Sequence, residues 1–217
     1  MAFEALQCQC LIKEAVIPLL DGLSGSAAAI DSVNTIVNDD GVLTGYNTDY
    51  LAIERLLAEY RVPAESTVLL QGSGGMAKAV AAALRDAGFT SVTIVARNEE
   101  SGRALAGLYG FSWQAEVGAS TAEMLINVTP LGMQGADAEA LAFPEPTIAS
   151  AKTIFDVVAL PAQTPLIKAA QAQGKLVISG AEVVAIQAEE QFVLYTGVRP
   201  SVAQVREASE FSRAQSA

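Results

Sequence analysis

Histidine is absent from this chain of 217 residues, and cysteine occurs only twice, at Cys8 and Cys10. The lack of histidine excludes the commonest general base in enzymes and every catalytic triad that depends on it. It also excludes a zinc site of the usual cysteine and histidine type, so we expect no metal site. Any acid–base chemistry must therefore use lysine, aspartate, glutamate, tyrosine or cysteine. The two cysteines are interpreted as small side chains of a strand.

Positive charge is also scarce. The chain has 13 lysines and arginines against 24 aspartates and glutamates, which gives a formal net charge of −11. Such a charge repels nucleic acid and anionic membrane surfaces. No apolar run approaches the roughly 18 residues that a spanning helix needs, and the N-terminus lacks a basic segment followed by an apolar one. We therefore expect a cytoplasmic protein without nucleic acid or membrane partners.

Short β-prone runs alternate with longer helical runs from Thr67 onward. The strand-like runs are TVLL, SVTIVA, EMLINV, TIFDVV and KLVIS, and the helix-like runs are MAKAVAAALRDAG, EESGRALAGLYG and TPLIKAAQAQG. The strand-like runs lack polar alternation, as expected for a parallel sheet that is buried on both faces. This pattern predicts an α/β protein with a Rossmann-type doubly wound parallel sheet over residues 64–192. Further helices are expected over 181–197 and 201–215.

The N-terminal part of the chain has a different pattern. A helix is expected over residues 13–23, followed by a hairpin whose tight turn is Asp40-Gly41. Thr48 or Asp49 would then cap a helix over 50–60. We interpret residues 1–63 as a partial α/β substrate domain, and residues 193–217 as a C-terminal helix that packs back toward it.

A glycine-rich turn joins the strand that begins near Thr67 to the next helix. A tight turn needs a residue without Cβ, close approach of a pyrophosphate needs another, and close helix packing favours a small third. Gly72, Gly74 and Ala77 meet these demands, and a helix beginning near Gly75 would direct its free N–H groups toward phosphates. A purely structural turn is the alternative. The predicted cofactor-binding residues of this turn are Gly72, Ser73, Gly74, Gly75, Met76 and Ala77.

The end of the following strand indicates which dinucleotide is bound. Sites that prefer NAD place an acidic residue there to hold the ribose hydroxyls. This chain offers Arg97 and Asn98 first, and these suit the 2′-phosphate of NADP. Glu99 and Glu100 follow, where negative charge is favourable in the first turn of a helix. We therefore predict NADP as the cofactor.

Several short motifs occur in order along the chain. They are VNT, YNTDY, GSGGMAKA, ARN, INVTPLGM, TPLI and SGAEVVAIQA. In this order and spacing the motifs resemble the shikimate dehydrogenase family, particularly its shikimate dehydrogenase-like branch, over nearly the whole chain. The resemblance implies oxidation of a ring hydroxyl of shikimate to 3-dehydroshikimate with NADP, in aromatic amino-acid biosynthesis.

The resemblance also implies a catalytic pair. The family's lysine maps onto Lys13 in LIKEA, and its aspartate maps onto Asp49 in YNTDY. Removal of hydride from an alcohol carbon requires the hydroxyl proton to leave, and a lysine beside a carboxylate can relay that proton without histidine. The alternatives are a solvated charge at a helix end for Lys13 and a helix N-cap for Asp49.

Two further residues resemble the family's ligands for substrate hydroxyls. Asn34 lies in VNT and Gln187 lies in AIQAEE, and Asp49 is expected to contact the substrate as well. Taken alone, Asn34 is typical of a turn or hairpin. Gln187 alone is typical of an exposed helical position.

Four residues are predicted to contact the cofactor near the other strand ends. Asn127 and Thr129 lie at the end of the strand-like run EMLINV, where open α/β sheets place their ligands. A plain turn at the end of that strand is the alternative. Val157 and Gly180 match family positions that approach the nicotinamide, although as isolated residues they are typical of a core and a turn.

Some features depart from the family pattern. Family members normally begin with a further stretch that forms much of the substrate domain's sheet, and this stretch has no counterpart in the present sequence. Gln9 and Leu11 replace a Thr or Ser and a Pro, and Ala159 replaces a tyrosine that contacts substrate in many members. The alternatives are therefore a truncated NADP-binding protein with little or no dehydrogenase activity, and a quinate/shikimate dehydrogenase that uses NAD. An incomplete first domain is also compatible with a homo-oligomer.

Overall fold

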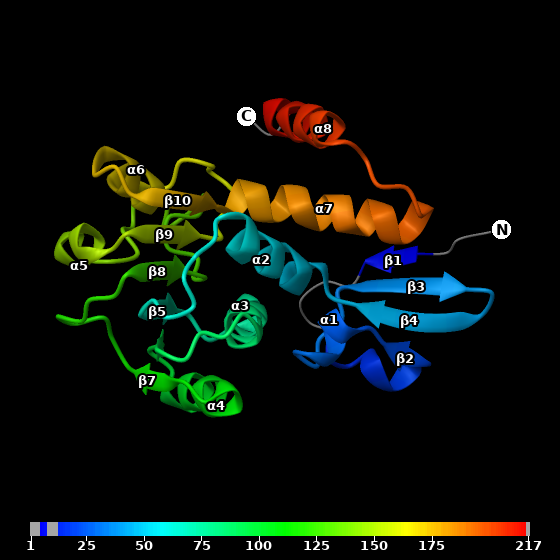
Figure 1. Ribbon diagram of the computed structural model, residues 1–217, viewed down its shortest axis with the longest axis horizontal. Helices are drawn as coiled ribbons and strands as arrows, with labels where there is room; N and C mark the ends of the chain where they lie inside the picture. The colour runs from blue at the N-terminus through cyan, green and yellow to red at the C-terminus, as the bar shows by residue number, and fades with distance from the viewer. Residues whose placement is uncertain (1–4, 8–12, 216–217) are drawn as a thin grey trace. The chain divides into compact units, whose positions relative to one another are not determined.

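The computed structural model describes residues 5–7 and 13–215, and the chain forms two compact units (Figure 1). The N/C-terminal unit comprises Met1–Ala52 and Val184–Ala217, and the central unit comprises Ile53–Val183. Both divisions fall within helices, α2 (Thr48–Glu59) and α7 (Gly180–Thr196). They differ from the predicted boundaries after residues 63 and 192 because each helix contributes residues to both units. Cys8, Gln9, Cys10 and Leu11 lie outside the described residues.

The central unit contains a six-stranded parallel sheet. Its strands are β5 (Val68–Gln71), β6 (Val92–Val95), β7 (Ser112–Gln114), β8 (Met124–Asn127), β9 (Thr153–Asp156) and β10 (Leu176–Ser179). They lie in the order β10-β9-β8-β5-β6-β7 (Figure 1). The chain runs outward from β5 to one edge and then returns to the other side of β5, which creates a switch point between β5 and β8. This order confirms the predicted Rossmann-type sheet, although β7 was not expected as a separate strand.

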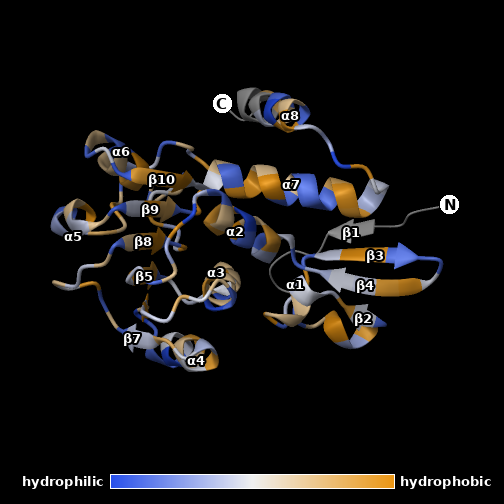
Figure 2. Cartoon of the chain, in the orientation of Figure 1, coloured by the Kyte–Doolittle hydropathy of each residue, from blue (hydrophilic) through white to orange (hydrophobic). Residues whose placement is uncertain are grey.

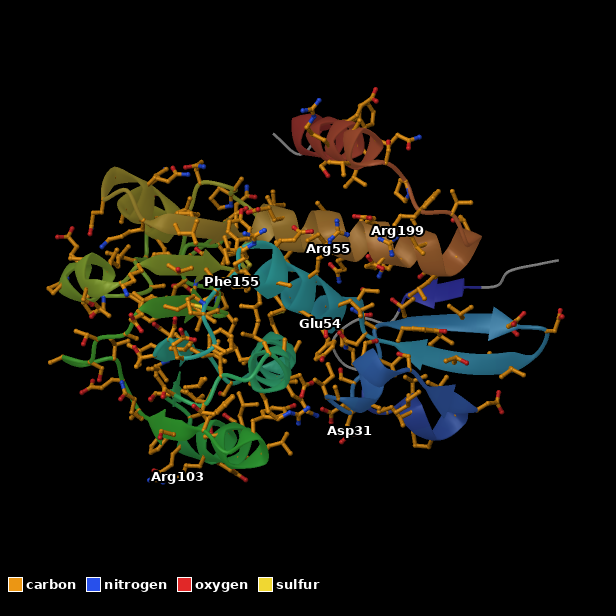
Figure 3. All side chains as sticks on the ribbon, viewed as in Figure 1. Asp31, Glu54, Arg55, Arg103, Phe155 and Arg199 are labelled. Atoms are coloured by element: carbon orange, nitrogen blue, oxygen red, sulfur yellow. The ribbon has the colours of Figure 1, made fainter. Side chains whose placement is uncertain are left out.

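Buried residues on both faces explain why the strands are continuously apolar. Ile154 and Phe155 are neighbours on β9, so their side chains point to opposite faces, and both are fully buried. Phe155 is labelled in Figure 3. The helices of this unit are α3 (Gly75–Asp86), α4 (Glu99–Tyr109), α5 (Glu145–Ser150) and α6 (Pro165–Ala172). The structure confirms α3, α4 and α6, whereas the short α5 was not predicted. Alanines make up most of the buried face of α3, which permits close packing.

In the N/C-terminal unit, the predicted hairpin is confirmed. Strands β3 (Thr35–Asp39) and β4 (Val42–Tyr46) are antiparallel, and the two residues between them, Asp40 and Gly41, both have positive φ. This geometry is typical of a two-residue hairpin turn, and Figure 2 shows a hydrophilic tip. Among the described residues, β1 (Ala5–Gln7) and β2 (Gly22–Leu23) complete a sheet in the order β1-β3-β4-β2.

The predicted helix over residues 13–23 is wrong. The segment forms turns and a short 3-10 helix, Ile17–Leu19, before it enters β2. Pro18 has no N–H with which to donate an α-helical bond. Three residues later, the backbone N–H of Asp21 donates to the carbonyl of Leu43 on β4 at 2.9 Å. Sheet pairing therefore replaces helix up to β2, and the next helix is the short α1 (Gly25–Ala28).

The cap of α2 also differs from the expectation. Asn47 Oδ1 accepts a hydrogen bond from the backbone N–H of Tyr50 at 3.0 Å, so Asn47 caps the helix in place of Thr48 or Asp49. Both of these residues lie in the first helical turn. The C-terminal helices α7 and α8 (Val202–Gln215) are present as predicted. Within the described residues, no helix is both long enough and apolar enough to cross a membrane.

Candidate active site

Three segments that are distant in the sequence meet at the carboxylate of Asp49. Asp49 Oδ2 accepts from Lys13 Nζ at 2.8 Å, and Oδ1 accepts from Gln187 Nε2 at 2.6 Å. The Asp49 side chain is only 7% exposed, whereas that of Lys13 is 22% exposed. A nearly buried carboxylate is thus held between an amine donor and an amide donor. The amine keeps contact with solvent, through which protons can be exchanged.

Backbone pairing brings Lys13 and Asn34 to the start of β3. The Lys13 carbonyl accepts from the Val33 N–H at 2.8 Å, and the Asn34 N–H donates to the Tyr46 carbonyl at 3.0 Å. Asn34 is thereby fixed next to the residue that holds Lys13. We call Lys13, Asn34, Asp49 and Gln187 the Asp49 cluster, since all four predicted residues lie in the N/C-terminal unit.

Asn34 is linked to Asp49 through the residue that precedes the carboxylate. Its side-chain Oδ1 accepts from the Thr48 N–H at 2.9 Å and from the Thr48 hydroxyl at 3.2 Å. Because Thr48 begins α2, this contact ties the start of β3 to the first turn of the helix that carries Asp49. A negative charge in that turn is favoured by the helix dipole.

The Asp49 cluster combines groups that suit proton transfer at a bound hydroxyl. An amine can receive the hydroxyl proton, and the adjacent carboxylate stabilises the ammonium ion that results. The carboxamides of Asn34 and Gln187 provide neutral polar groups nearby. In the part of the chain that the structure describes, no group of acidic or cysteine side chains is arranged to hold a metal ion.

The glycine-rich turn of the central unit has a geometry that suits a dinucleotide diphosphate. Gly72 has φ of +127°, and an added Cβ would lie 2.7 Å from a methyl group of Val128, so packing alone requires glycine there. By contrast, a Cβ added to Gly74 or Gly75 would meet nothing within 4 Å. The N-cap of α3 is Gly74, which has no side chain to accept from the helix, so the first N–H groups are available to a ligand. The turn therefore fits the predicted cofactor.

The hydroxyl of Ser73 in this turn contacts a residue that sequence reasoning missed. Ser73 Oγ and Ser101 Oγ are 2.8 Å apart and share a hydrogen bond. Ser101 also donates its backbone N–H to Asn98 Oδ1 at 3.0 Å, so Asn98 caps α4. The spacing of Asn98 and Ser101 is typical of a helix N-cap, so the sequence could have indicated that Asn98 caps α4 through Ser101. Met76 and Ala77 lie in the first turn of α3, and Ala77 is fully buried.

Arg97 lies in the bend that follows β6 and is exposed. Another arginine of the same region is engaged, since Arg103 pairs with Glu99 at 2.8 Å and lies over the ring of Trp113. The carboxylate of Glu99 is therefore engaged by an arginine of the same helix, α4. The side-chain oxygen of Asn98, Oδ1, accepts the hydrogen bond of the helix cap. The side-chain N–H₂ of Asn98 is then the group left to face an anion.

Asn127 and Thr129 make contacts that occupy their side chains within the protein. Asn127 is fully buried, and its Nδ2 donates to the Leu131 carbonyl at 3.1 Å and to Asp156 Oδ1 at 3.0 Å. Its Oδ1 accepts from the backbone and hydroxyl of Thr129. Each hydrogen-bonding position of the Asn127 carboxamide is therefore used. The alternative of a strand-ending turn accounts for this side chain without a ligand.

Asp156 is a second missed residue, and it lies at the end of β9. Its carboxylate accepts from the Thr164 hydroxyl at 2.6 Å and from the Val158 N–H at 3.2 Å. Burial raises the pKa of Asp156, while the hydrogen bonds from Thr164, Val158 and Asn127 act in the opposite direction. Together with Asn127, it holds the carboxyl ends of β8 and β9 in place.

Val157 and Gly180 lie against each other. A Cβ added to Gly180 would overlap the backbone carbonyl groups of Val157 and Val158. Gly180 is the first residue of α7, and the side chain of Glu182 reaches back to the preceding Ser179, where its Oε2 accepts from the Ser179 N–H at 2.9 Å and from the Ser179 hydroxyl at 2.7 Å. Tyr60 donates its hydroxyl proton to the other oxygen of Glu182. The serine and glutamate spacing in SGAE could have indicated this contact.

No protein-family model matches the chain. Among curated proteins, the chain is 50% identical over 202 residues to a shikimate dehydrogenase-like protein of Haemophilus influenzae, with 93% of this chain and 74% of the relative covered. It is 38% identical over 200 residues to a shikimate dehydrogenase (NADP(+)) of Oleidesulfovibrio alaskensis, with 89% of this chain and 71% of the relative covered.

Solved structures of similar proteins share this fold. A shikimate 5-dehydrogenase-like protein superposes with a TM-score of 0.94 at 48% identity, covering 96% of this chain and 78% of its own. Shikimate 5-dehydrogenase from Thermus thermophilus in complex with NADP(H) and shikimate has a TM-score of 0.84 at 31% identity, covering 96% and 79%. Quinate dehydrogenase from Corynebacterium glutamicum in complex with NAD has the same TM-score and identity, covering 96% and 77%.

Proposed function

We propose that this chain, which belongs to the shikimate dehydrogenase family of oxidoreductases, oxidises a ring hydroxyl of shikimate to 3-dehydroshikimate with NADP as hydride acceptor. The observation that carries the proposal is the carboxylate of Asp49, held at 2.8 Å by Lys13 and at 2.6 Å by Gln187. The Thermus thermophilus relative, whose structure contains both NADP(H) and shikimate, supports the choice of substrate and cofactor.

The reaction removes two hydrogens from the alcohol in different forms. A hydride leaves the carbon, and a proton leaves the oxygen, so that a ketone, reduced cofactor and one proton are formed. NADP, when bound, supplies the hydride acceptor. In its neutral form the Lys13 amine takes the proton from the hydroxyl oxygen, and Asp49 stabilises the resulting ammonium ion through their 2.8 Å contact. Because Lys13 is partly exposed, the proton can then pass to water.

The two carboxamides of the Asp49 cluster hold the remaining hydroxyl groups of the ligand. Gln187 uses its Nε2 on Asp49, so its Oε1 is the atom left to accept from a ligand hydroxyl. Asn34 uses its Oδ1 within the protein, so its Nδ2 is the atom left to donate. A hydroxylated ring acid can satisfy both, since each hydroxyl both donates and accepts.

The cofactor is held by groups of the central unit. The first N–H groups of α3, near Gly74 and Gly75, bind the diphosphate. Arg97 provides the positive charge that pairs with the 2′-phosphate of NADP. Because NAD lacks this phosphate, the pairing would favour NADP over NAD. Ser73 and Ser101 offer hydroxyl groups beside the same turn.

Initial rates of cofactor reduction with four substrate and cofactor pairs test the proposal. The pairs are shikimate or quinate with NADP or NAD, and shikimate with NADP should give the highest kcat/KM. A higher value for quinate with NAD would support the activity for which the Corynebacterium glutamicum relative is named. Binding of NADP without turnover of either acid would support a protein that only binds the nucleotide.

A further inference from the structure

The side chain of Asn34 has a fixed orientation. It is 2% exposed, and its Oδ1 accepts three hydrogen bonds: from the Thr48 N–H at 2.9 Å, the Thr48 hydroxyl at 3.2 Å and the Thr35 hydroxyl at 3.0 Å. A backbone N–H can only donate, so the atom that faces Thr48 must be the carbonyl oxygen of the carboxamide. The amide nitrogen must therefore point the other way.

That nitrogen is the unusual feature of the site. Asn34 Nδ2 is buried and has no hydrogen-bond partner among the described residues. An unpaired buried donor costs free energy, and native structures rarely leave one without a hydrogen-bond partner. Because Val33 pairs with Lys13 and Thr48 precedes Asp49, this donor belongs to the Asp49 cluster.

A second glutamine of α7 acts on the same network. Gln191 Nε2 donates to Thr35 Oγ1 at 3.3 Å. An amide nitrogen can only donate, so it occupies a lone pair of the Thr35 hydroxyl, and the single proton of that hydroxyl is then directed at Asn34. Gln191 lies one helical turn after Gln187, on the same face of α7, so neighbouring glutamines support Asp49 and Asn34 respectively.

We infer that Thr35 and Thr48 are positioning residues that hold Asn34 as an obligate hydrogen-bond donor toward the ligand. Gln191 acts one step further away, because it sets the direction in which the Thr35 hydroxyl donates. This role rests on the proposed function, in which the Asp49 cluster binds a hydroxylated ring acid. The ligand must place an oxygen lone pair against Asn34 Nδ2, so an analogue that lacks this oxygen is rejected.

Two substitutions of Thr35 separate the hydroxyl from the packing of the side chain. Thr35→Val keeps the shape but removes the hydroxyl, and we expect KM for shikimate to rise about tenfold, which corresponds to one hydrogen bond. The kcat value and NADP affinity should change much less, because Lys13 and the central unit are unaltered. Thr35→Ser keeps the hydroxyl and should restore most of the wild-type KM. A merely structural role would lower thermal stability without this selective effect on KM.

Substitutions of Gln191 test the direction of the proton. Gln191→Glu places a carboxylate that accepts the Thr35 proton and withdraws it from Asn34, so KM should rise about tenfold. Gln191→Leu leaves the proton free to point at Asn34 and should raise KM less than Gln191→Glu does. Gln171→Glu, on the exposed surface of α6, adds the same charge elsewhere and should leave KM unchanged.

Asn34→Asp tests the donor itself. An aspartate still accepts from Thr35 and Thr48, so the variant should fold and bind NADP, but it offers oxygen in place of Nδ2 and should weaken shikimate binding about a hundredfold. Wild-type KM in Thr35→Val or Gln191→Glu, in a protein that oxidises shikimate, would overturn the inference and leave the proposed function intact. A wild type that neither binds nor oxidises shikimate would refute both.

Discussion

Gln187 on α7 donates a 2.6 Å hydrogen bond to Asp49 on α2, although 138 positions separate them in the sequence. The other oxygen of this carboxylate receives Lys13. The glutamine amide therefore fixes the rotation of the carboxylate and, with it, the direction from which the lysine amine is held. A residue that resembles a substrate ligand in the sequence also supports the proposed catalytic pair.

Replacement of Gln187 should therefore reduce catalysis as well as binding. Gln187→Leu leaves one oxygen of a nearly buried carboxylate without its donor, and we expect kcat/KM for shikimate to fall about 10- to 100-fold, the range for a hydrogen bond to a charged group. NADP affinity should be unchanged. Gln171→Leu, the same substitution on exposed α6, provides the control. A wild-type kcat/KM in Gln187→Leu would show that the amide does not support Asp49.

Arg97 should determine the choice between the two dinucleotides. Arg97→Ala removes the charge that pairs with the 2′-phosphate, so the dissociation constant for NADP should rise about 10- to 100-fold while that for NAD changes little. Arg103→Ala is the matched control, because Arg103 is already paired with Glu99. Calorimetric titration of both variants with both nucleotides gives the comparison. Equal losses for NADP and NAD in Arg97→Ala would remove Arg97 from this role.

Gly72 should be sensitive to the smallest possible side chain. Gly72→Ala combines a φ of +127° with a Cβ at 2.7 Å from a Val128 methyl group, so we expect a loss of about 1–3 kcal/mol in the free energy of unfolding and weaker NADP binding. Gly107→Ala lies within α4, where a Cβ meets nothing within 4 Å, and should stabilise the protein by about 0.5–1 kcal/mol. Urea denaturation measures both changes, and equal effects would contradict this account of the turn.

Tyr60 should make stability depend on alkaline pH. Burial, followed by the hydrogen bond to Glu182, raises the pKa of Tyr60 from 10.0 to about 12. The folded protein keeps the phenolic proton where the unfolded chain releases it, so this contribution to stability is complete below pH 10.0 and is lost as the pH approaches about 12. The Tyr60→Phe variant has no phenolic proton and therefore lacks this pH-dependent contribution to the free energy of unfolding. The free energy of unfolding should fall more steeply over that range in the wild type, and parallel curves for the two proteins would refute the assignment.

The elements with strong local signals could be predicted from the sequence. Apolar runs without polar alternation indicated the buried parallel strands, and Asp40-Gly41 indicated the hairpin because both residues accept positive φ. The prediction of a helix over 13–23 was wrong because tertiary contacts override the local pattern. Its apolar residues follow a helical period, but Pro18 interrupts the hydrogen bonding and Asp21 pairs with Leu43 on β4.

The candidate site shows the same limit. Lys13 and Asp49 could be identified as a candidate pair from sequence motifs. A motif does not show the orientation of a carboxamide side chain, which decides whether its oxygen or its nitrogen faces a ligand. The sequence alone did not indicate that Asn127 spends all its hydrogen bonds inside the protein, or that Thr35 and Thr48 leave one amide donor of Asn34 unpaired. These properties depend on contacts between segments far apart in the chain, and only the folded structure reveals them.

The central claim is that Lys13, held by Asp49, takes the proton from a shikimate hydroxyl. Its most direct test is the rate of NADPH formation from shikimate and NADP by the wild type and by Lys13→Ala, with NADP binding measured for both. The account predicts turnover in the wild type, a loss of at least about 100-fold in kcat for the variant, and equal NADP affinity. Equal rates for the two proteins would contradict it.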